Sequence, residues 1–151
     1  MLRQQLKDSL KAAMLEKDAR RLSTVRLILA ALKDRDIAAR PEGRSDGISD
    51  DEILQMLQSM IKQRRDSIAL YEQGGRADLA RQEGEEIVII QGFMPAQMSE
   101  AETEAAIAAL IEEIGAASLK DMGRTMAALK ERFAGRMDFG KASGLVKGKL
   151  G

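Results

Sequence analysis

The sequence predicts an all-α protein with an N-terminal four-helix domain over residues 1–93 and a small three-helix C-terminal module over residues 96–151. Three observations support this fold class. Aromatic residues make up only 3% of the 151 residues, and strong helix formers such as alanine, leucine, glutamate and arginine dominate. Apolar side chains recur every three or four residues, as the buried face of a helix requires. Glycine and proline gather at a few places between these periodic segments.

The first two helices are predicted from apolar spacing. From residue 2 to residue 14, a leucine or methionine recurs at every fourth position, which predicts a helix ending near residue 17. The expected buried stripe consists of Leu2, Leu6, Leu10 and Met14. A second helix is expected from about Arg20. It fades into the segment 40–48, where proline and glycine predict a polar loop.

The third and fourth helices are marked by their ends. Ser49 and Glu52 have the spacing of a capping box, in which the serine hydroxyl accepts from the backbone and the carboxylate reaches back. The third helix is expected to run from there to Gly74, and the fourth from about residue 77 to residue 91. We expect the three glutamates of the fourth helix, Glu83, Glu85 and Glu86, to face largely outward.

Two groups of charged residues in this domain could form a binding or catalytic site. The basic run at residues 62–65 could contact an anion, and the acidic group at residues 83–86 could supply general acids or Mg²⁺ ligands. We expect both groups to be structural, because no glycine loop of the kind that cradles phosphate accompanies the acids. Lys62 and Asp66 have the i,i+4 spacing of an ion pair on a helix, and the acids are expected to form solvated ion pairs with neighbouring arginines.

The segment Gly92-Phe93-Met94-Pro95 is the best candidate for a domain boundary, because a proline disfavours helix at the residue before it. Ser99 and Glu102 then repeat the capping-box spacing. Three helices are expected after this point: one that stops at Gly115, one that stops at Gly135, and a last one over residues 139–150.

The last predicted helix carries glycine at every fourth position. At about 100° per residue, Gly140, Gly144 and Gly148 fall on one narrow stripe, with Lys141 on one side and Lys147 on the other. A glycine costs about 1 kcal/mol relative to alanine inside a helix, so three of them indicate a use other than helix stability. The pattern predicts an exposed backbone ridge bordered by positive charge. Such a ridge suits a phosphate backbone or a second helix.

The composition excludes several kinds of chemistry. Without cysteine or histidine there is no thiolate nucleophile, no imidazole base and no zinc site of the usual kind, and we expect no metal and no cofactor. No apolar run approaches the roughly 20 residues of a bilayer span, so no membrane partner is expected. Because the N-terminus lacks a signal peptide's apolar region and the chain has no cysteine, a cytoplasmic location is expected.

Charge is distributed unevenly, although the formal net charge is zero. Residues 1–49 carry eleven basic and seven acidic side chains, and residues 118–151 carry eight basic and three acidic ones. Residues 93–117 hold five acidic side chains and no basic one. Such a segregation of charge gives information about binding partners but not about the fold.

Several motifs taken together resemble the YqeY family. They are Lys62-Gln63-Arg64-Arg65-Asp66-Ser67, Gly75-Arg76-Ala77-Asp78-Leu79-Ala80 with Glu83, Phe93-Met94-Pro95-Ala96-Gln97-Met98-Ser99, Asp121-Met122-Gly123-Arg124-Thr125-Met126 and Leu145-Val146-Lys147. The similarity covers essentially the whole chain. The more usual pattern has Tyr-Leu before the first proline of these motifs, where this chain has Phe93-Met94, an apolar exchange.

The resemblance implies a two-part helical protein. Its C-terminal part is similar to the tail of the B subunit of tRNA-dependent amidotransferases, which convert misacylated Glu-tRNA or Asp-tRNA to the glutaminyl or asparaginyl form. Similar modules are appended to some glutaminyl-tRNA synthetases, and in both settings the tail contacts tRNA. The resemblance therefore implies a tRNA-associated accessory protein without catalysis of its own. Its implied partners are tRNA and an aminoacyl-tRNA synthetase or amidotransferase.

On this basis we expect the C-terminal module to bind tRNA through basic side chains. The expected RNA-binding residues are Arg124, Lys130, Arg136, Lys141, Gly144, Lys147 and Lys149, with Arg132 beside them. Because aromatic residues are few, recognition would depend on the backbone and shape of the RNA rather than on base stacking. The plainer alternative is a solvated basic face with helix packing at the glycines.

Two other functions stay open at this point. The family resemblance also implies a carbon–nitrogen ligase with glutamine as amido-N-donor, acting within a complex. The residues themselves offer no catalytic constellation, because there is no Gly-x-Ser-x-Gly elbow and the pair Ser143 and Lys147 is expected on an exposed helix. The third possibility is a helical protein-interaction module whose glycine ridge packs on a partner helix.

Overall fold

The structure is a computed structural model that describes residues 1–151, and it contains helices and turns but no strand. The predicted all-α class is confirmed. The helices are α1 (Leu2–Glu16), α2 (Ala19–Ala39), α3 (Asp50–Gln73), α4 (Ala77–Gln91), α5 (Glu100–Ile114), α6 (Met122–Arg132) and α7 (Phe139–Leu150), with short 3-10 helices η1 (Arg40–Glu42) and η2 (Leu119–Asp121).

The chain divides into two compact units, an N-terminal unit over Met1–Met94 and a C-terminal unit over Pro95–Gly151. Helices α1 to α4 lie in the first unit and α5 to α7 in the second, which is compatible with the predicted four-plus-three arrangement. No helix spans residues 92–99, because Pro95 has no N–H to donate and restricts the backbone of Met94.

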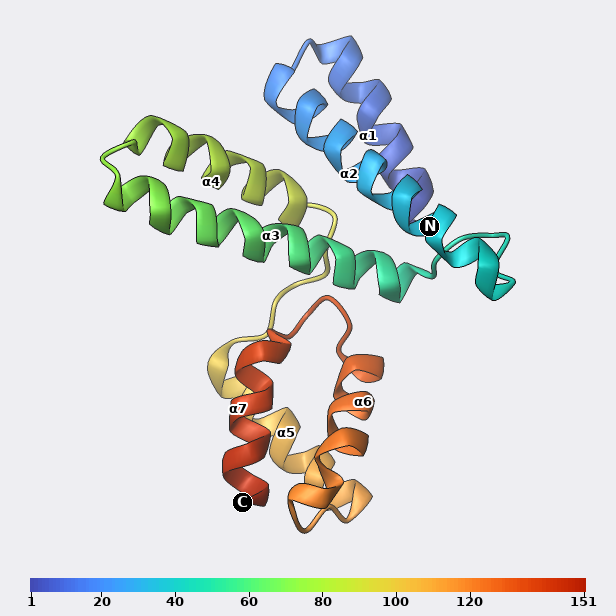
Figure 1. Ribbon diagram of the computed structural model, residues 1–151, viewed down its shortest axis with the longest axis vertical. Coiled ribbons are helices and arrows are strands. Elements are labelled where there is room, and N and C mark those ends of the chain that lie inside the picture. The colour runs from blue at the N-terminus through green and yellow to red at the C-terminus, as the bar shows by residue number, and fades with distance from the viewer. The chain divides into compact units, whose positions relative to one another are not determined.

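Two helical hairpins build the N-terminal unit (Figure 1). Helices α1 and α2 are joined at Lys17, which adopts a left-handed backbone conformation with a φ of 56°. Helices α3 and α4 are joined at Gly74 and Gly75. All four helices contribute to one core, whose fully buried members include Leu6, Ile28, Ile53, Met56, Leu57 and Ile90. Burying one such side chain contributes about 1.5–3 kcal/mol, so this core holds the two hairpins together.

The predicted buried stripe of α1 is wrong at its C-terminal end. Leu2 and Leu6 are buried, but Leu10 is only partly buried and Met14 is 53% exposed. A repeat of four residues advances about 40° per step on a helix with 3.6 residues per turn, so the stripe turns away from the core. Ser9 and Ala13 take the buried positions instead.

Both predicted capping boxes are present. The Ser49 hydroxyl accepts from the Glu52 backbone N–H at 3.2 Å, and the Glu52 carboxylate accepts from the Ser49 backbone N–H at 3.3 Å. Ser99 and Glu102 repeat the arrangement at 3.1 Å and 3.2 Å. Each box satisfies two backbone groups that a helix start leaves without a partner, so it fixes where α3 and α5 begin.

Helices α5, α6 and α7 surround a second core in the C-terminal unit, with α6 and α7 running antiparallel (Figure 1). The buried side chains of this core are Ile107, Leu110, Leu129, Met137, Ala142, Val146 and Leu150. The segment before α5 is attached to the loop between α6 and α7, because the Met98 backbone N–H donates to the Arg136 carbonyl at 2.8 Å. This core fixes which faces of α6 and α7 point outward.

Candidate nucleic-acid interface

Helix α7 begins at a cap and exposes its glycines. One carboxylate oxygen of Asp138 accepts from the backbone N–H groups of Gly140 and Lys141 at 3.0 Å and 3.2 Å, which starts the helix at Phe139. All three glycines of α7 lie exposed, and a Cβ added at Gly144 or Gly148 would meet no atom within 4 Å. The predicted exposed glycine ridge is therefore present in the structure.

The opposite side of α7 explains this orientation. Ala142, Val146 and Leu150 recur at every fourth position and are buried in the core of the C-terminal unit. Because this apolar stripe faces inward, the glycine stripe on the far side of the helix faces solvent. We use the name glycine ridge for Gly140, Gly144 and Gly148.

The four lysines of the predicted RNA-binding set are exposed and form no ion pair in the structure. Lys141 and Lys147 border the ridge on α7, Lys149 lies near the end of the same helix, and Lys130 lies on α6. Lys147 and Lys149 also lie in the last turn, where positive charge interacts favourably with the helix dipole. These ammonium groups are therefore available to a negatively charged partner.

The arginines named with these lysines are instead bound within the C-terminal unit. Arg132 donates both terminal nitrogens to the Glu113 carboxylate at 2.6 Å and 2.8 Å, and this hydrogen-bonded pair lowers the pKa of Glu113. Arg124 donates to Asp121 at 3.1 Å and to the Ile114 carbonyl at 2.9 Å.

Arg136 is likewise engaged, because it donates to the carbonyl of Ala96 at 3.2 Å. All three arginines thus link separate segments of the C-terminal unit. The structure therefore separates the predicted RNA-binding set into lysines that are available and arginines that are already hydrogen-bonded within the unit.

Lys120 is a basic residue that the sequence interpretation omitted. It lies on η2, is exposed, and forms no ion pair. Its neighbour Leu119 lies 3.9 Å from the position of a Cβ on Gly151, so η2 packs beside the end of α7. No helical periodicity marks a three-residue turn, and the only available signal was that Lys120 belongs to the basic segment 118–151.

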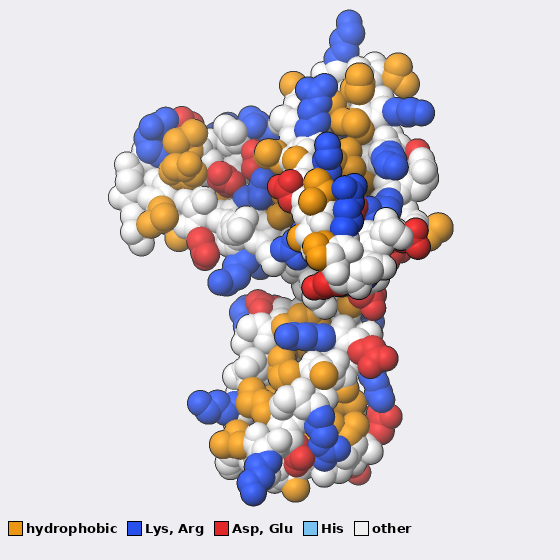
Figure 2. Space-filling view, turned by 45° about the vertical axis from the view of Figure 1, so that its right-hand side comes forward, with side chains coloured by type: hydrophobic (Ala, Val, Ile, Leu, Met, Phe, Trp, Pro, Cys, Tyr) orange, Lys and Arg blue, Asp and Glu red, His pale blue; other side chains and the backbone are white.

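Charge is segregated within the C-terminal unit. The unit carries eight basic and eight acidic side chains, but five of the acidic ones lie on α5 and every basic one lies after α5. Figure 2 shows basic side chains standing apart from one another on the lower, C-terminal unit, with apolar surface between them. Such a dispersed arrangement fits an extended anionic partner better than a single small anion.

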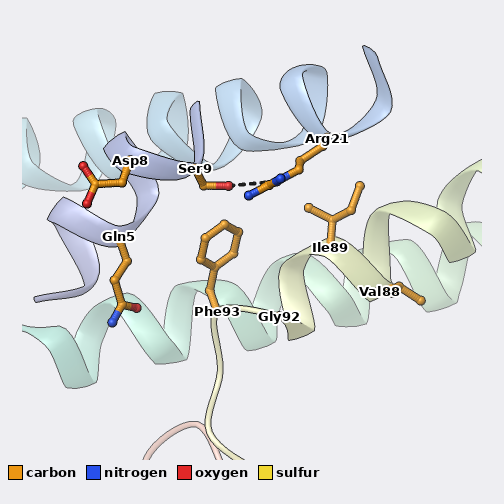
Figure 3. Close-up of a pocket in the computed structure, with 8 residues that line it drawn as sticks. All are labelled: Gln5, Asp8, Ser9, Arg21, Val88, Ile89, Gly92 and Phe93. Carbon is orange, nitrogen blue, oxygen red and sulfur yellow. Dashed lines mark hydrogen bonds between the residues drawn. The ribbon is translucent and has the colours of Figure 1, made fainter. Parts of the chain in front are cut away.

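A hollow in the N-terminal unit has a different character. Its volume is about 490 Å³, and it is lined by residues of α1, α2 and α4 together with Phe93. Figure 3 shows the Phe93 ring lying between these helices, and the Arg21 guanidinium donating to the Ser9 hydroxyl at 3.1 Å. An arginine does not act as a base toward a hydroxyl at neutral pH, so this contact is structural.

The acidic group of α4 does not face outward as a whole. Glu86 is 8% exposed, and its carboxylate accepts from Arg64 of α3 at 2.9 Å. Glu83 lies 3.9 Å from the same guanidinium, and burial beside the Glu86 carboxylate raises the pKa of Glu83. The prediction fails at Glu86 because this residue precedes the buried Ile90 by four positions and shares its face.

The basic run of α3 is structural at Arg64, which joins α3 to α4. The expected ion pair between Lys62 and Asp66 is wrong, because it is absent from the structure.

No group of three or more acidic side chains is placed to hold a metal ion, and no hydrogen bond joins Ser143 to Lys147. None of the helices is both long and apolar enough to cross a membrane.

Comparison with protein-family models matches residues 3–150 to the family described as Yqey-like protein. The chain belongs to the YqeY family. The match extends through both units, so the family relationship covers the core hairpins of the N-terminal unit and also the helix that carries the glycine ridge. The resemblance identified from the motifs is confirmed.

Three curated relatives of this YqeY chain are named "Altered inheritance of mitochondria protein 41, mitochondrial". The Lachancea thermotolerans protein is 34% identical over 112 residues, which cover 72% of this chain and 57% of the relative. The Kluyveromyces lactis protein is 33% identical over 91 residues, covering 60% and 47%, and the Saccharomyces cerevisiae (strain YJM789) protein is 36% identical over 91 residues, covering 59% and 46%. The chain spans about half the length of these relatives.

These names contradict the expected cytoplasmic location, because they place the relatives in mitochondria. The expected location rested on the residues at the start of the sequence and on the absence of cysteine. Neither feature identifies the compartment in which a chain resides. The expectation was therefore drawn too narrowly for a YqeY chain.

Proposed function

We propose that the protein is a tRNA-associated accessory protein whose C-terminal unit binds the RNA backbone. The observation that carries the proposal is that two exposed lysines without ion pairs, Lys141 and Lys147, border the glycine ridge of α7. The family resemblance, which implies a likeness of the C-terminal module to the tail of amidotransferase B subunits, favours tRNA as the RNA. No catalytic step is assigned to the chain.

Two physical effects would act together at this surface. Each lysine that neutralises a phosphate releases condensed counterions, so RNA binding would weaken as salt rises. Because Lys141 and Lys147 have no carboxylate partner, they lose no ion pair when they bind phosphate. The missing side chains at Gly144 and Gly148 would let the phosphate backbone approach the helix closely.

The test is a filter-binding titration of bulk tRNA at two salt concentrations with three proteins. They are the wild type, Lys141→Glu/Lys147→Glu on α7, and Lys7→Glu/Lys11→Glu on α1. Lys7 and Lys11 are exposed and form no ion pair, so the control variant changes net charge equally at another surface. We expect the α7 variant to bind at least about tenfold more weakly and to lose about two units of salt slope.

The control variant is expected to retain most of the affinity. Equal loss in both variants would show that net charge alone drives binding, and equal weak binding by all three proteins would remove the proposal. Association that does not depend on salt but disappears in Gly144→Leu would instead favour the helical protein-interaction module. Far-UV circular dichroism of each variant checks that the helices are intact.

A further inference from the structure

A second hollow lies beside the glycine ridge, between α5 and α7 in the C-terminal unit. Its volume is about 380 Å³, within the range of about 300–1,000 Å³ typical of small-ligand pockets. Gly144 forms part of its wall, and a Cβ there would meet no atom within 4 Å. Lys141 also lines it. The hollow therefore opens directly onto the surface where the RNA backbone is proposed to lie.

The floor of the hollow suits a flat, apolar-faced group. Met98 and Leu145 contribute apolar side chains, and Thr103 contributes a side chain that is 8% exposed. The Thr103 hydroxyl donates to the Ser99 carbonyl at 2.8 Å, so its donor is already used at the start of α5. Methionine adapts its shape to a ring and makes favourable contacts with it through its polarizable sulfur. One unstacked base would find a complementary surface here.

The rim of the hollow carries two carboxylates and one ammonium group. Glu100 is exposed and is engaged in no hydrogen bond or ion pair in the structure. Asp138 uses one carboxylate oxygen to cap α7, and no hydrogen bond involves its other oxygen. Carboxylates only accept hydrogen bonds when ionised, so they favour a donor such as the exocyclic amino group of a base. They would repel a phosphate, which Lys141 is placed to attract.

We infer that this hollow takes one unpaired base bearing an exocyclic amino group from the RNA that the lysines hold. The inference rests on the proposed function, because Lys141 belongs to both surfaces. Unpaired bases in loops and at ends are the parts of RNA whose Watson–Crick edges proteins can read. Cytosine presents an amino group where uracil presents a carbonyl oxygen, so the carboxylates favour cytosine.

The experiment measures fluorescence anisotropy of the full chain with labelled ten-nucleotide oligo(C) and oligo(U) at pH 7.5. The two share backbone and ring size and differ in the donor or acceptor at the base edge. We expect oligo(C) to bind about tenfold more tightly, as one good edge contact allows, with a ratio that does not change with salt. Cytidine monophosphate is expected to bind at least a hundredfold more weakly than oligo(C), because it offers a single phosphate.

Two matched variants assign the preference to the hollow. Glu100→Gln is expected to bring the ratio of the oligo(C) and oligo(U) affinities close to one, because an amide can donate to uracil. Glu104→Gln, on the same helix but outside the hollow, is expected to retain the tenfold ratio. Equal affinity for the two oligonucleotides in the wild type would overturn the inference.

The failure of each proposal has its own signature. If tRNA binding depends on salt and is lost in Lys141→Glu/Lys147→Glu, but oligo(C) and oligo(U) bind equally, the proposed function stands. The assignment of a base to the hollow is then wrong. Absence of RNA binding in every titration would overturn both. Cytidine monophosphate binding as tightly as oligo(C) would overturn the assignment to an RNA-held base, since a free nucleotide would then suffice.

Discussion

The N-terminal unit and helix α7 use basic side chains in opposite ways. In the N-terminal unit, arginines join elements that are distant in sequence, as Arg3 does with Asp36 and Arg64 with Glu86. On α7, Lys141 and Lys147 project from the surface without any carboxylate partner. Arginine offers a rigid fork that holds a fixed geometry, whereas lysine is a flexible point charge. The difference indicates that these arginines stabilise the first unit, whereas Lys141 and Lys147 are available for binding on α7.

The glycines sharpen this contrast. Gly84 interrupts α4 of the N-terminal unit once, whereas the glycine ridge repeats at every fourth residue of α7. Exposed lysines occur on α1 as well, but large apolar side chains such as Leu15, which is 84% exposed, accompany them there. Positive charge alone therefore does not distinguish the α7 surface. The combination of positive charge with accessible backbone at the glycines distinguishes the α7 surface.

The largest expected effect comes from breaking the buried ion pair between α3 and α4. Arg64→Ala is expected to lower the free energy of unfolding by about 3–5 kcal/mol, because it leaves the Glu86 carboxylate buried without its partner. Urea unfolding followed by circular dichroism measures the change. The double variant Arg64→Met/Glu86→Leu serves as the control and is expected to recover most of the loss. A loss below about 1 kcal/mol in Arg64→Ala would contradict a stabilising role for this charge.

The next effect concerns the start of α7. Asp138→Ala is expected to cost about 1 kcal/mol, because the backbone N–H groups of Gly140 and Lys141 lose their acceptor. Asp138→Asn keeps a good capping side chain and is expected to stay within a few tenths of a kcal/mol of the wild type. Thermal unfolding compares the three proteins. Equal destabilisation by alanine and asparagine would show that the charge, and not the cap, fixes this helix.

Glycine substitutions compare the two units directly. Gly144→Ala and Gly84→Ala are each expected to raise the free energy of unfolding by about 0.5–1 kcal/mol, because a Cβ meets no atom at either site and alanine favours helix. Only Gly144→Ala is expected to weaken tRNA binding, by several-fold, because it covers the ridge.

Urea unfolding and the tRNA titration together measure both effects. Unchanged tRNA affinity in Gly144→Ala would mean that the ridge is not the contact. An equal loss of affinity in Gly84→Ala would show instead that binding depends on helix flexibility rather than on the accessible backbone of α7.

The fold class followed from the sequence because helices depend on local signals. The spacing Ser49 to Glu52 predicted a cap that needs only four residues to form, and Gly115 predicted a helix end that the structure shows in a left-handed conformation. Burial of Glu86 did not follow, because it depends on Arg64, which reaches it from another helix. Local periodicity carries no information about such a partner.

The candidate site was predicted only in part for the same reason. Exposure of the glycine ridge followed from the opposite apolar stripe on one helix. The engagement of Arg124 and Arg132 did not, because their partners lie on other segments, and the hollow beside Gly144 requires α5 to pack against α7. Features that need two elements to meet are the ones that sequence reasoning missed.

The smallest expected effect tests the surface charges of the N-terminal unit by pH. Arg44 donates to both carboxylate oxygens of Glu52, and this pairing lowers the pKa of Glu52 from 4.5 to about 2. A folded-state pKa below the unfolded value means that the stabilisation is complete above about pH 4.5 and is lost as the pH falls toward 2. Both side chains are more than one third exposed, so solvent screening limits the contribution to less than about 1 kcal/mol.

The measurement is an NMR titration of the Glu52 carboxyl in the wild type and in Arg44→Leu. Removal of the guanidinium is expected to raise the Glu52 pKa toward its ordinary value, while the Ser49 backbone contact keeps it somewhat lowered. Unfolding free energies of the wild type and Glu52→Gln, measured at pH 6 and pH 3, should converge at the lower pH, because glutamine preserves the capping box but not the charge. If the pKa of Glu52 has its ordinary value in the wild type, the pair of Arg44 and Glu52 adds no stability. The contrast between stabilising arginines in the N-terminal unit and unpaired lysines on α7 would then hold only for the buried pair of Arg64 and Glu86.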